Sequence, residues 1–137
     1  MRPFTTRALP VAPDLTAPDG AQVRLLSDLA GGSMAHFELA PGQSSMAVTH
    51  RTVEEIWYVL SGKGQMWRHQ DGDSSITDLE AGISLTIPLG THFQFRNTGP
   101  TPFTAVAVTM PPWPGDGEAV PVAGEWTPSP PTPPPAG

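Results

Sequence analysis

Apolar and polar side chains alternate along much of the chain between residues 22 and 110. In the stretch 33–40, for example, Ala35, Phe37 and Leu39 occupy every second position. Such a period of two is typical of a strand with one buried face, and no segment keeps a helical apolar period. The expected strands are residues 22–28, 33–40, 45–50, 55–60, 64–70, 83–87, 92–97 and 103–110.

Turn-forming residues separate these segments. Pro41-Gly42, Ser61-Gly62-Lys63 and Asp71-Gly72-Asp73 each fall between two expected strands. Short strands at even spacing with such breaks indicate a β-sandwich or a small barrel. With 137 residues in total, the chain is long enough for one hydrophobic core and too short for two ordinary ones. We therefore predict a single all-β domain over residues 21–110.

The two ends of the chain do not follow this pattern. Residues 1–20 contain four prolines and a Pro-Asp-Gly turn, which predict an irregular N-terminal arm. Residues 111–127 are rich in proline and are expected to form a lid or a packing strap. Residues 128–137 contain six prolines and no large apolar side chain, so they are expected to be disordered or polyproline II.

Composition and charge exclude several classes of protein. The formal net charge is −6 with a single lysine, which argues against nucleic-acid binding. The absence of cysteine excludes disulfides and thiolate chemistry. No apolar run is long enough for a membrane span, and prolines and acids interrupt the N-terminus where a signal peptide needs an apolar stretch. We therefore expect a cytoplasmic protein without a membrane or nucleic-acid partner.

Two groups of residues with fixed spacing lie within the expected domain. Residues 41–64 read PGQSSMAVTHRTVEEIWYVLSGKG, and residues 82–97 read GISLTIPLGTHFQFRN. Both resemble the signature motifs of the cupin superfamily. The matching positions are Gly42, His50, Glu55 and Gly62 in the first motif, and Gly82, Pro88, Gly90 and Asn97 in the second. The resemblance implies a cupin-type conical β-barrel of two facing antiparallel sheets.

The departures from these motifs concern the metal ligands. The resemblance implies three histidines and one glutamate or glutamine around a divalent metal ion. Here Val48 and Phe93 stand at two of the histidine positions, so only His50 and Glu55 remain in register. His92 lies one residue early, and a shift of one residue along a strand turns a side chain to the other face.

Three interpretations of the His50–Glu55 pair follow. The first, which we favour, is an acid–base pair in a small-molecule pocket, because histidine titrates near neutral pH and a carboxylate can orient it. The second is an ion pair left from a lost metal site. The third is a site for Fe, Mn, Ni or Zn completed by His92, which requires a bulge that turns this ring inward.

Several large side chains are candidates to line the pocket. Val48, Trp57, Phe93 and Phe95 have the parity of an inward-facing wall, and Trp113 follows the last strand at a place where it could cover a barrel mouth. We therefore expect a metal-independent isomerase, cyclase or lyase acting on a small molecule. The alternatives are a metal-dependent, dioxygenase-like cupin that uses His50, Glu55 and His92, and a non-catalytic cupin that binds a small ligand.

One strand is apolar on both faces. Ile56, Tyr58 and Leu60 have the opposite parity to Glu55, so a partner subunit or the N-terminal arm is expected to cover them. Because cupins commonly dimerise, the resemblance favours a homodimer. His36 is expected on the outer surface or at an interface.

Overall fold

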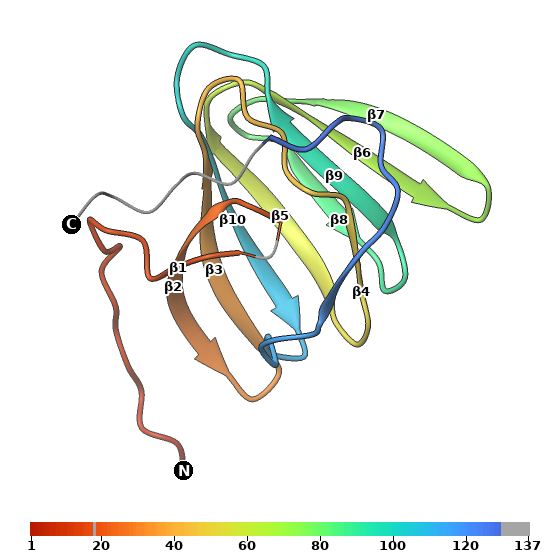
Figure 1. Ribbon diagram of the computed structural model, residues 1–137. Helices are drawn as coiled ribbons and strands as arrows, with labels where there is room; N and C mark the ends of the chain where they lie inside the picture. The colour runs from red at the N-terminus through yellow and green to blue at the C-terminus, as the bar shows by residue number, and fades with distance from the viewer. Residues whose placement is uncertain (18, 130–137) are drawn as a thin grey trace.

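The chain forms two antiparallel sheets that face each other (Figure 1). The computed structural model describes residues 1–17 and 19–129. One sheet has the order β1 (Leu15–Thr16), β2 (Gln22–Leu29), β3 (Gly32–Leu39), β10 (Phe103–Met110), β5 (Glu54–Ser61), β8 (Ser84–Ile87). The other has the order β11 (Ala119–Pro121), β4 (Val48–His50), β9 (His92–Asn97), β6 (Gly64–Gln70), β7 (Asp73–Leu79). The expected all-β fold of two facing antiparallel sheets is confirmed.

Each expected strand has a counterpart in the structure, and β6, β9 and β10 have the predicted bounds. β4 is shorter than expected and begins only at Val48. Three strands were not predicted: β1, β7 and β11. β7 is mostly exposed at the edge of its sheet, so its sequence carries no apolar alternation. β11 lies in the proline-rich segment and pairs with β4 through its backbone.

The space between the sheets is filled at one end and hollow at the other. At the filled end, Leu39 lies opposite Phe103 and both are almost fully buried. At the hollow end, Thr109 lies between Ser33 on β3 and Glu55 on β5, and all three line a cavity. The sheet register therefore places the first inward-facing residues of β10 in the core and the end of this strand beside the cavity.

Gly62 shows why the first motif requires glycine at this position. It forms the turn between β5 and β6 with φ = 85°. A Cβ atom built there would lie 2.6 Å from the carbonyl oxygen of Pro102. Any other residue would have to adopt a left-handed backbone and displace this neighbouring chain.

Residues 10 and 11 of the N-terminal arm lie on the face of β2 and β3 that points away from the cavity. Arg24 donates hydrogen bonds to the carbonyl oxygens of Pro10 and Val11, both at 2.9 Å. The cross-strand pair of Arg24 and His36 is buried beneath it. His36 lies on the outer face of its strand, as expected, but it is buried beneath the arm rather than exposed, because parity identifies the outer face of a strand but not what covers that face.

The C-terminal segment returns along the outer face of the second sheet. Gln94 is fully buried there, and its side chain donates to the carbonyl oxygens of Ser45 and Trp126 and accepts from the Trp126 amide. Ser129 exchanges two hydrogen bonds with Ser44. Of the tail expected to be disordered or polyproline II, residues 130–137 lie outside the described residues.

Among the residues that the structure describes, no helical segment has the length and hydropathy to span a bilayer.

Replacing Gln94 by alanine should destabilise the protein by about 2–3 kcal/mol, because three hydrogen bonds are lost and buried backbone groups are left without partners. Thermal unfolding should show a Tm lower by roughly 6–12 °C. Gln22→Ala, on the exposed start of β2, is the matched control and should leave the Tm unchanged. Similar small changes in both variants would show that the C-terminal segment contributes little to stability.

Candidate functional site

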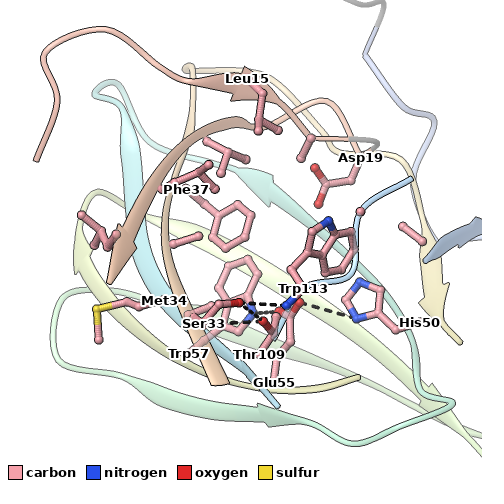
Figure 2. Close-up of a pocket in the computed structure, with 18 of the residues that line it drawn as sticks. Leu15, Asp19, Ser33, Met34, Phe37, His50, Glu55, Trp57, Thr109 and Trp113 are labelled. Carbon is pink, nitrogen blue, oxygen red and sulfur yellow. Dashed lines mark hydrogen bonds and ion pairs between the residues drawn. The ribbon is translucent and has the colours of Figure 1, made fainter. Parts of the chain in front are cut away.

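A cavity of about 610 Å³ opens between the two sheets at their hollow end. Its walls come from the N-terminal arm, from β2, β3, β4, β5, β9, β10 and β11, and from residues 111–118, which we call the strap (Figure 2). A volume of this size suits a small organic molecule. Most of the wall is apolar, and the polar groups that reach it are few.

The structure brings most of the candidate residues to this cavity. Six of them line it: Val48, His50, Glu55, Trp57, Phe93 and Trp113. Phe95 does not line it, although it shares the parity of Phe93. It is fully buried in the core, where its ring packs edge-on against Trp57 at 5.1 Å between centroids.

His92 lies on the opposite face of β9 from the cavity. Val48 pairs with Phe93 across β4 and β9, and both line the cavity, so the next pair, Thr49 and His92, points outward. The His92 ring lies near that of His69, with 5.9 Å between centroids. β9 is paired regularly at this point, so the bulge that the metal interpretation required is not formed. His92 therefore does not join His50 and Glu55.

His50 and Glu55 form the polar centre of the wall. The Nδ1 atom of His50 lies 3.5 Å from Oε1 of Glu55, and both side chains are buried. The indole nitrogen of Trp57 donates to Oε2 of Glu55 at 2.6 Å. Nδ1 of His50 has no hydrogen-bond partner, while the rings of Phe93 and Trp113 pack edge-on against the imidazole. The imidazole is thus held by packing, and its buried Nδ1 atom forms no hydrogen bond with the described residues.

Burial changes the protonation of this pair. It lowers the pKa of His50 to about 4, although the nearby charge of Glu118 acts in the opposite direction. It raises the pKa of Glu55 to about 7, an effect opposed by the Trp57 hydrogen bond and increased by the charge of Asp19. Near neutral pH the cavity therefore presents an uncharged imidazole beside a carboxyl group that can hold or release a proton.

Asp19 is a site residue that the sequence analysis missed. It follows β1 in the N-terminal arm, is 9% exposed and lines the cavity. One of its oxygens accepts a hydrogen bond from the amide of Ala21 at 3.1 Å. Burial raises its pKa to about 6. Its place in a Pro-Asp-Gly sequence indicated only a turn, and nothing in the local pattern links it to residues 36 positions away.

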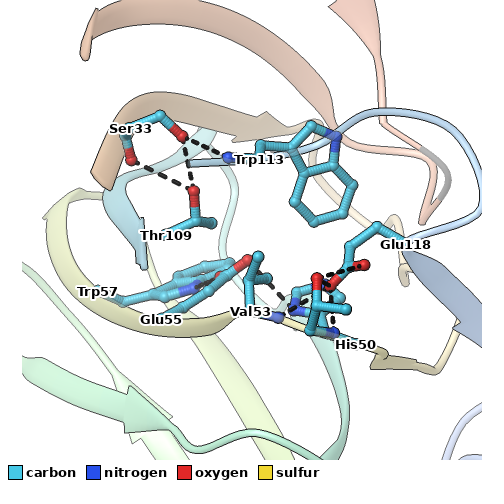
Figure 3. A network of polar contacts seen from close by, with 9 residues as sticks. Ser33, His50, Val53, Glu55, Trp57, Thr109, Trp113 and Glu118 are labelled. Carbon is cyan, nitrogen blue, oxygen red and sulfur yellow. Dashed lines mark hydrogen bonds and ion pairs between the residues drawn. The ribbon is translucent and has the colours of Figure 1, made fainter. Parts of the chain in front are cut away.

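Glu118 is the second missed residue. Its buried carboxylate accepts hydrogen bonds from the amide and hydroxyl groups of Thr52 and from the amide of Val53, at 2.6–2.9 Å (Figure 3). Burial alone would raise its pKa, but these hydrogen bonds and the charge of His50 outweigh that effect, so the pKa is lowered. Glu118 fixes the turn that leads from His50 to Glu55.

The strap is held at both ends. Near its start, the Trp113 amide donates to the hydroxyl of Ser33 at 2.9 Å, and that hydroxyl also contacts the Thr109 hydroxyl at 2.7 Å. At its far end, Glu118 forms the contacts described above. Figure 3 shows the Trp113 indole between these two attachments, above His50. These attachments position the indole at the cavity wall.

Comparison with known proteins shows which family this chain resembles. A family model described as "Cupin domain" matches residues 35–109. The uncharacterized protein MJ1618 of Methanocaldococcus jannaschii is 28% identical over 81 residues, which are 59% of this chain and 62% of that relative. The chain thus spans about three-fifths of that relative's length.

Solved structures show the same fold. An uncharacterized conserved protein with a double-stranded beta-helix domain from Klebsiella pneumoniae has a TM-score of 0.61 at 23% identity, over 79% of this chain and 89% of that one. Oxalate decarboxylase from Bacillus subtilis has a TM-score of 0.66 at 19% identity, over 78% of this chain and 29% of that one. At these identities the likeness shows the fold alone. Since the family model covers more than half of the sequence and both motifs lie in the strands and turns of the two facing sheets, the chain belongs to the cupin domain family.

Proposed function

We propose that this cupin catalyses proton transfer on a small molecule without a metal ion, with His50 and Glu55 as the acid–base pair. The observation that carries the proposal is their geometry: an imidazole and a carboxyl group lie 3.5 Å apart at the wall of the cavity. With a pKa of about 4 for His50 and about 7 for Glu55, the imidazole is uncharged near neutral pH and the carboxyl group is partly protonated, which are the protonation states that these roles require. At neutral pH the imidazole can accept a proton and the carboxyl group can donate one.

The two groups can act together in one reaction. In the isomerisation of a β,γ-unsaturated carbonyl compound, His50 takes a proton from the carbon next to the carbonyl group, and Glu55 gives its proton to the carbonyl oxygen, which forms a dienol. His50 then gives its proton to a different carbon, and Glu55 takes the proton back from the same oxygen. The double bond has then moved, and both residues have their initial protonation states. Cyclases and lyases need the same proton acceptor and donor, so the reaction is of the isomerase, cyclase or lyase type.

A metal-dependent reaction finds less support in the residues of this chain. Relatives of this fold include an oxalate decarboxylase described with Mn(II) centres. Here, however, Val48 and Phe93 have no lone pair to donate, and His92 points away. Within the described ranges, no group of three or more His, Asp or Glu side chains could hold a metal ion. The residues present therefore do not fit a divalent transition metal.

Protein purified without chelator should carry well under one equivalent of transition metal. Added Mn, Fe, Ni or Zn should raise the Tm by less than about 2 °C, because stabilisation by a ligand depends on its concentration relative to Kd. Metal analysis by mass spectrometry and thermal unfolding measure both quantities. Stoichiometric metal that is lost in His50→Ala protein would contradict this prediction and favour the dioxygenase-like alternative.

Hydrogen–deuterium exchange tests the proposed reaction directly. The protein is incubated in D₂O with a panel of small carbonyl compounds, and loss of the protons next to the carbonyl group is followed by NMR. We expect faster exchange for compounds that also bind, as judged by the fluorescence of Trp57 and Trp113. Binding without any exchange would instead support the second candidate, a non-catalytic small-ligand-binding cupin.

We also propose that the protein is a homodimer, formed through the outer face of β5. Ile56, Tyr58 and Leu60 are 47%, 48% and 42% exposed, and the arm, which lies over β2 and β3, leaves them uncovered. Met34 extends this apolar surface, since Met34 and Ile56 flank the same residue of β10. The cytoplasmic location expected from the sequence also remains a proposal.

Light scattering at micromolar concentration should therefore give the mass of a dimer. Replacing Ile56 and Tyr58 together by lysine should give a monomer that keeps its β-sheet circular dichroism, because charges in an apolar interface are costly to bury. Lysine at Ser75, on the exposed edge strand β7, is the control and should leave the dimer intact. A monomeric wild-type protein would contradict the proposal.

A further inference from the structure

The cavity combines acidic groups with aromatic walls. Asp19, Asp28, Glu55 and Asp116 line it, and the one cationic side chain among the described lining residues, Arg7, is already paired with Asp14 at 2.9 Å. Among the described residues, Asp19, Asp28 and Asp116 form no ion pair. The cavity thus has an excess of carboxyl groups without a cationic partner.

Two of these groups are buried and reach into the cavity. Asp19 is 9% exposed, and its carboxyl group accepts a hydrogen bond from the Ala21 amide but forms no ion pair with a cationic side chain of the described residues. Glu55 is 4% exposed, and its Oε1 faces only the His50 nitrogen at 3.5 Å. Figure 2 shows the two carboxyl groups on opposite sides of the cavity, with aromatic rings around the space between them. Two buried carboxyl groups that no Lys or Arg side chain of the described residues neutralises favour a ligand that brings a positive charge.

The aromatic residues provide a second and independent feature. Phe37 and Trp57 stack in parallel, with 5.2 Å between centroids and an interplanar angle of 3°. Trp113 and Phe93 stand edge-on to His50 and form further parts of the wall. The faces of aromatic rings carry negative charge density and attract organic cations, and Trp does so most strongly.

We propose that the cavity binds an organic cation, namely a small amine or a quaternary ammonium compound, between its aromatic rings and the carboxyl groups of Asp19 and Glu55. This inference rests on the proposed function, because it names the substrate class for the same site. An anionic ligand would meet four acidic side chains. A neutral ligand of equal shape would fill the volume but leave the carboxyl groups without a counter-charge.

The protonation of the site agrees with this choice. Burial raises the pKa of both Asp19 and Glu55, since each carboxylate is costly to ionise in a poorly solvated place. A bound cation supplies the opposite charge that the Asp19 carboxylate lacks, while Glu55, with a pKa of about 7, is only partly ionised at neutral pH and the proposed reaction uses the fraction that still holds its proton. His50, with a pKa lowered to about 4, stays uncharged near neutral pH and does not repel a cation.

Two probes of the same shape test the inference. Choline and 3,3-dimethyl-1-butanol differ only in a positively charged nitrogen that replaces a carbon atom. Their affinities for the wild-type chain are measured at neutral pH and constant salt by isothermal calorimetry and tryptophan fluorescence. We expect choline to bind at least about tenfold more tightly than the alcohol. Equal affinity, preference for the alcohol, or no binding of choline at millimolar concentration would overturn the inference.

Variants locate the preference within the cavity. Asp19→Asn and Glu55→Gln should each reduce the preference for choline about fivefold or more while leaving the affinity for the alcohol unchanged, since only the charge is removed. Asp78→Asn, on β7 and outside the cavity, is the matched control. If both carboxyl variants keep the full preference, the cation is bound elsewhere and the inference fails.

The outcomes separate this inference from the proposed function. Preference for choline without proton exchange in any bound compound would reject catalysis and keep the cation site. Proton exchange in neutral ketones without preference for choline would keep catalysis and reject the cation site.

Discussion

His50→Ala protein should exchange protons of a bound carbonyl compound about 10²- to 10⁴-fold more slowly than the wild type, because the variant has no group that can take the proton. The fold should remain intact, since the imidazole is held by the edges of Phe93 and Trp113 and accepts no hydrogen bond at Nδ1 that other residues need. His69→Ala is the control, because His69 lies on the outer face with His92. An equal loss of rate in both variants would contradict the role of His50.

Glu55→Gln has a different signature, which appears in the dependence on pH. The wild-type rate should fall below about pH 4, where His50 becomes protonated, and above about pH 7, where Glu55 loses the proton that it donates. Glutamine can still accept the hydrogen bond from Trp57 but has no proton to lose in this range. The variant should therefore be slower near neutral pH and should lack the decline above pH 7. A decline that persists in Glu55→Gln protein would assign it to another group.

Glu118→Ala should destabilise the protein by about 3 kcal/mol, because the amides of Thr52 and Val53 lose a charged acceptor in a buried place. This corresponds to a fall in Tm of roughly 10 °C for a chain of this size. The strap should also lose its far attachment, so the Trp113 indole should become more accessible to quenchers of its fluorescence. Glu118→Gln should cost less, since an amide oxygen can still accept from both backbone groups.

The effect of Glu118 should depend on pH in a defined direction. Its pKa in the folded protein is lowered, so its contribution to stability is fully present above its unfolded value of about 4.5 and is lost as the pH falls through the folded value. The difference in Tm between the wild type and Glu118→Ala should therefore shrink in acid. Glu125→Ala, an exposed residue of the same C-terminal segment, is the control and should leave the Tm unchanged at each pH. A constant difference between pH 7 and pH 3 would contradict the role of the carboxylate.

The sequence predicted on which face of a strand most side chains lie, but not whether they lie beside the cavity or in the filled core. Alternation on β9 correctly separated His92 from Phe93, because it depends only on the period of a strand. The same rule grouped Phe95 with Phe93, yet Phe95 lies two residues deeper, where the sheets are already filled. Depth along a strand depends on register with both neighbours, and register is not a local property.

The site residues that the sequence analysis missed lie far along the sequence from the residues beside which the fold places them. Asp19 lines the same cavity as Glu55 but comes from the N-terminal arm, and Glu118 binds Thr52 from the strap. Both lie in segments where proline removes the alternation on which the prediction relied. The same holds for β11, whose pairing with β4 depends on where the fold returns the chain rather than on its own side chains.

The cavity extends beyond the part of the chain that defines the family. The shared region covers residues 35–109, whereas Asp19 precedes it and Trp113 follows it, together with other parts of the wall. A protein trimmed to the shared region would keep His50 and Glu55 but would lose part of the cavity wall and expose both side chains to solvent. Relatives could thus acquire new ligands by exchanging their ends while the inherited sheets stay the same. Sequence comparison restricted to the shared region would then group proteins by ancestry and leave their ligands undistinguished.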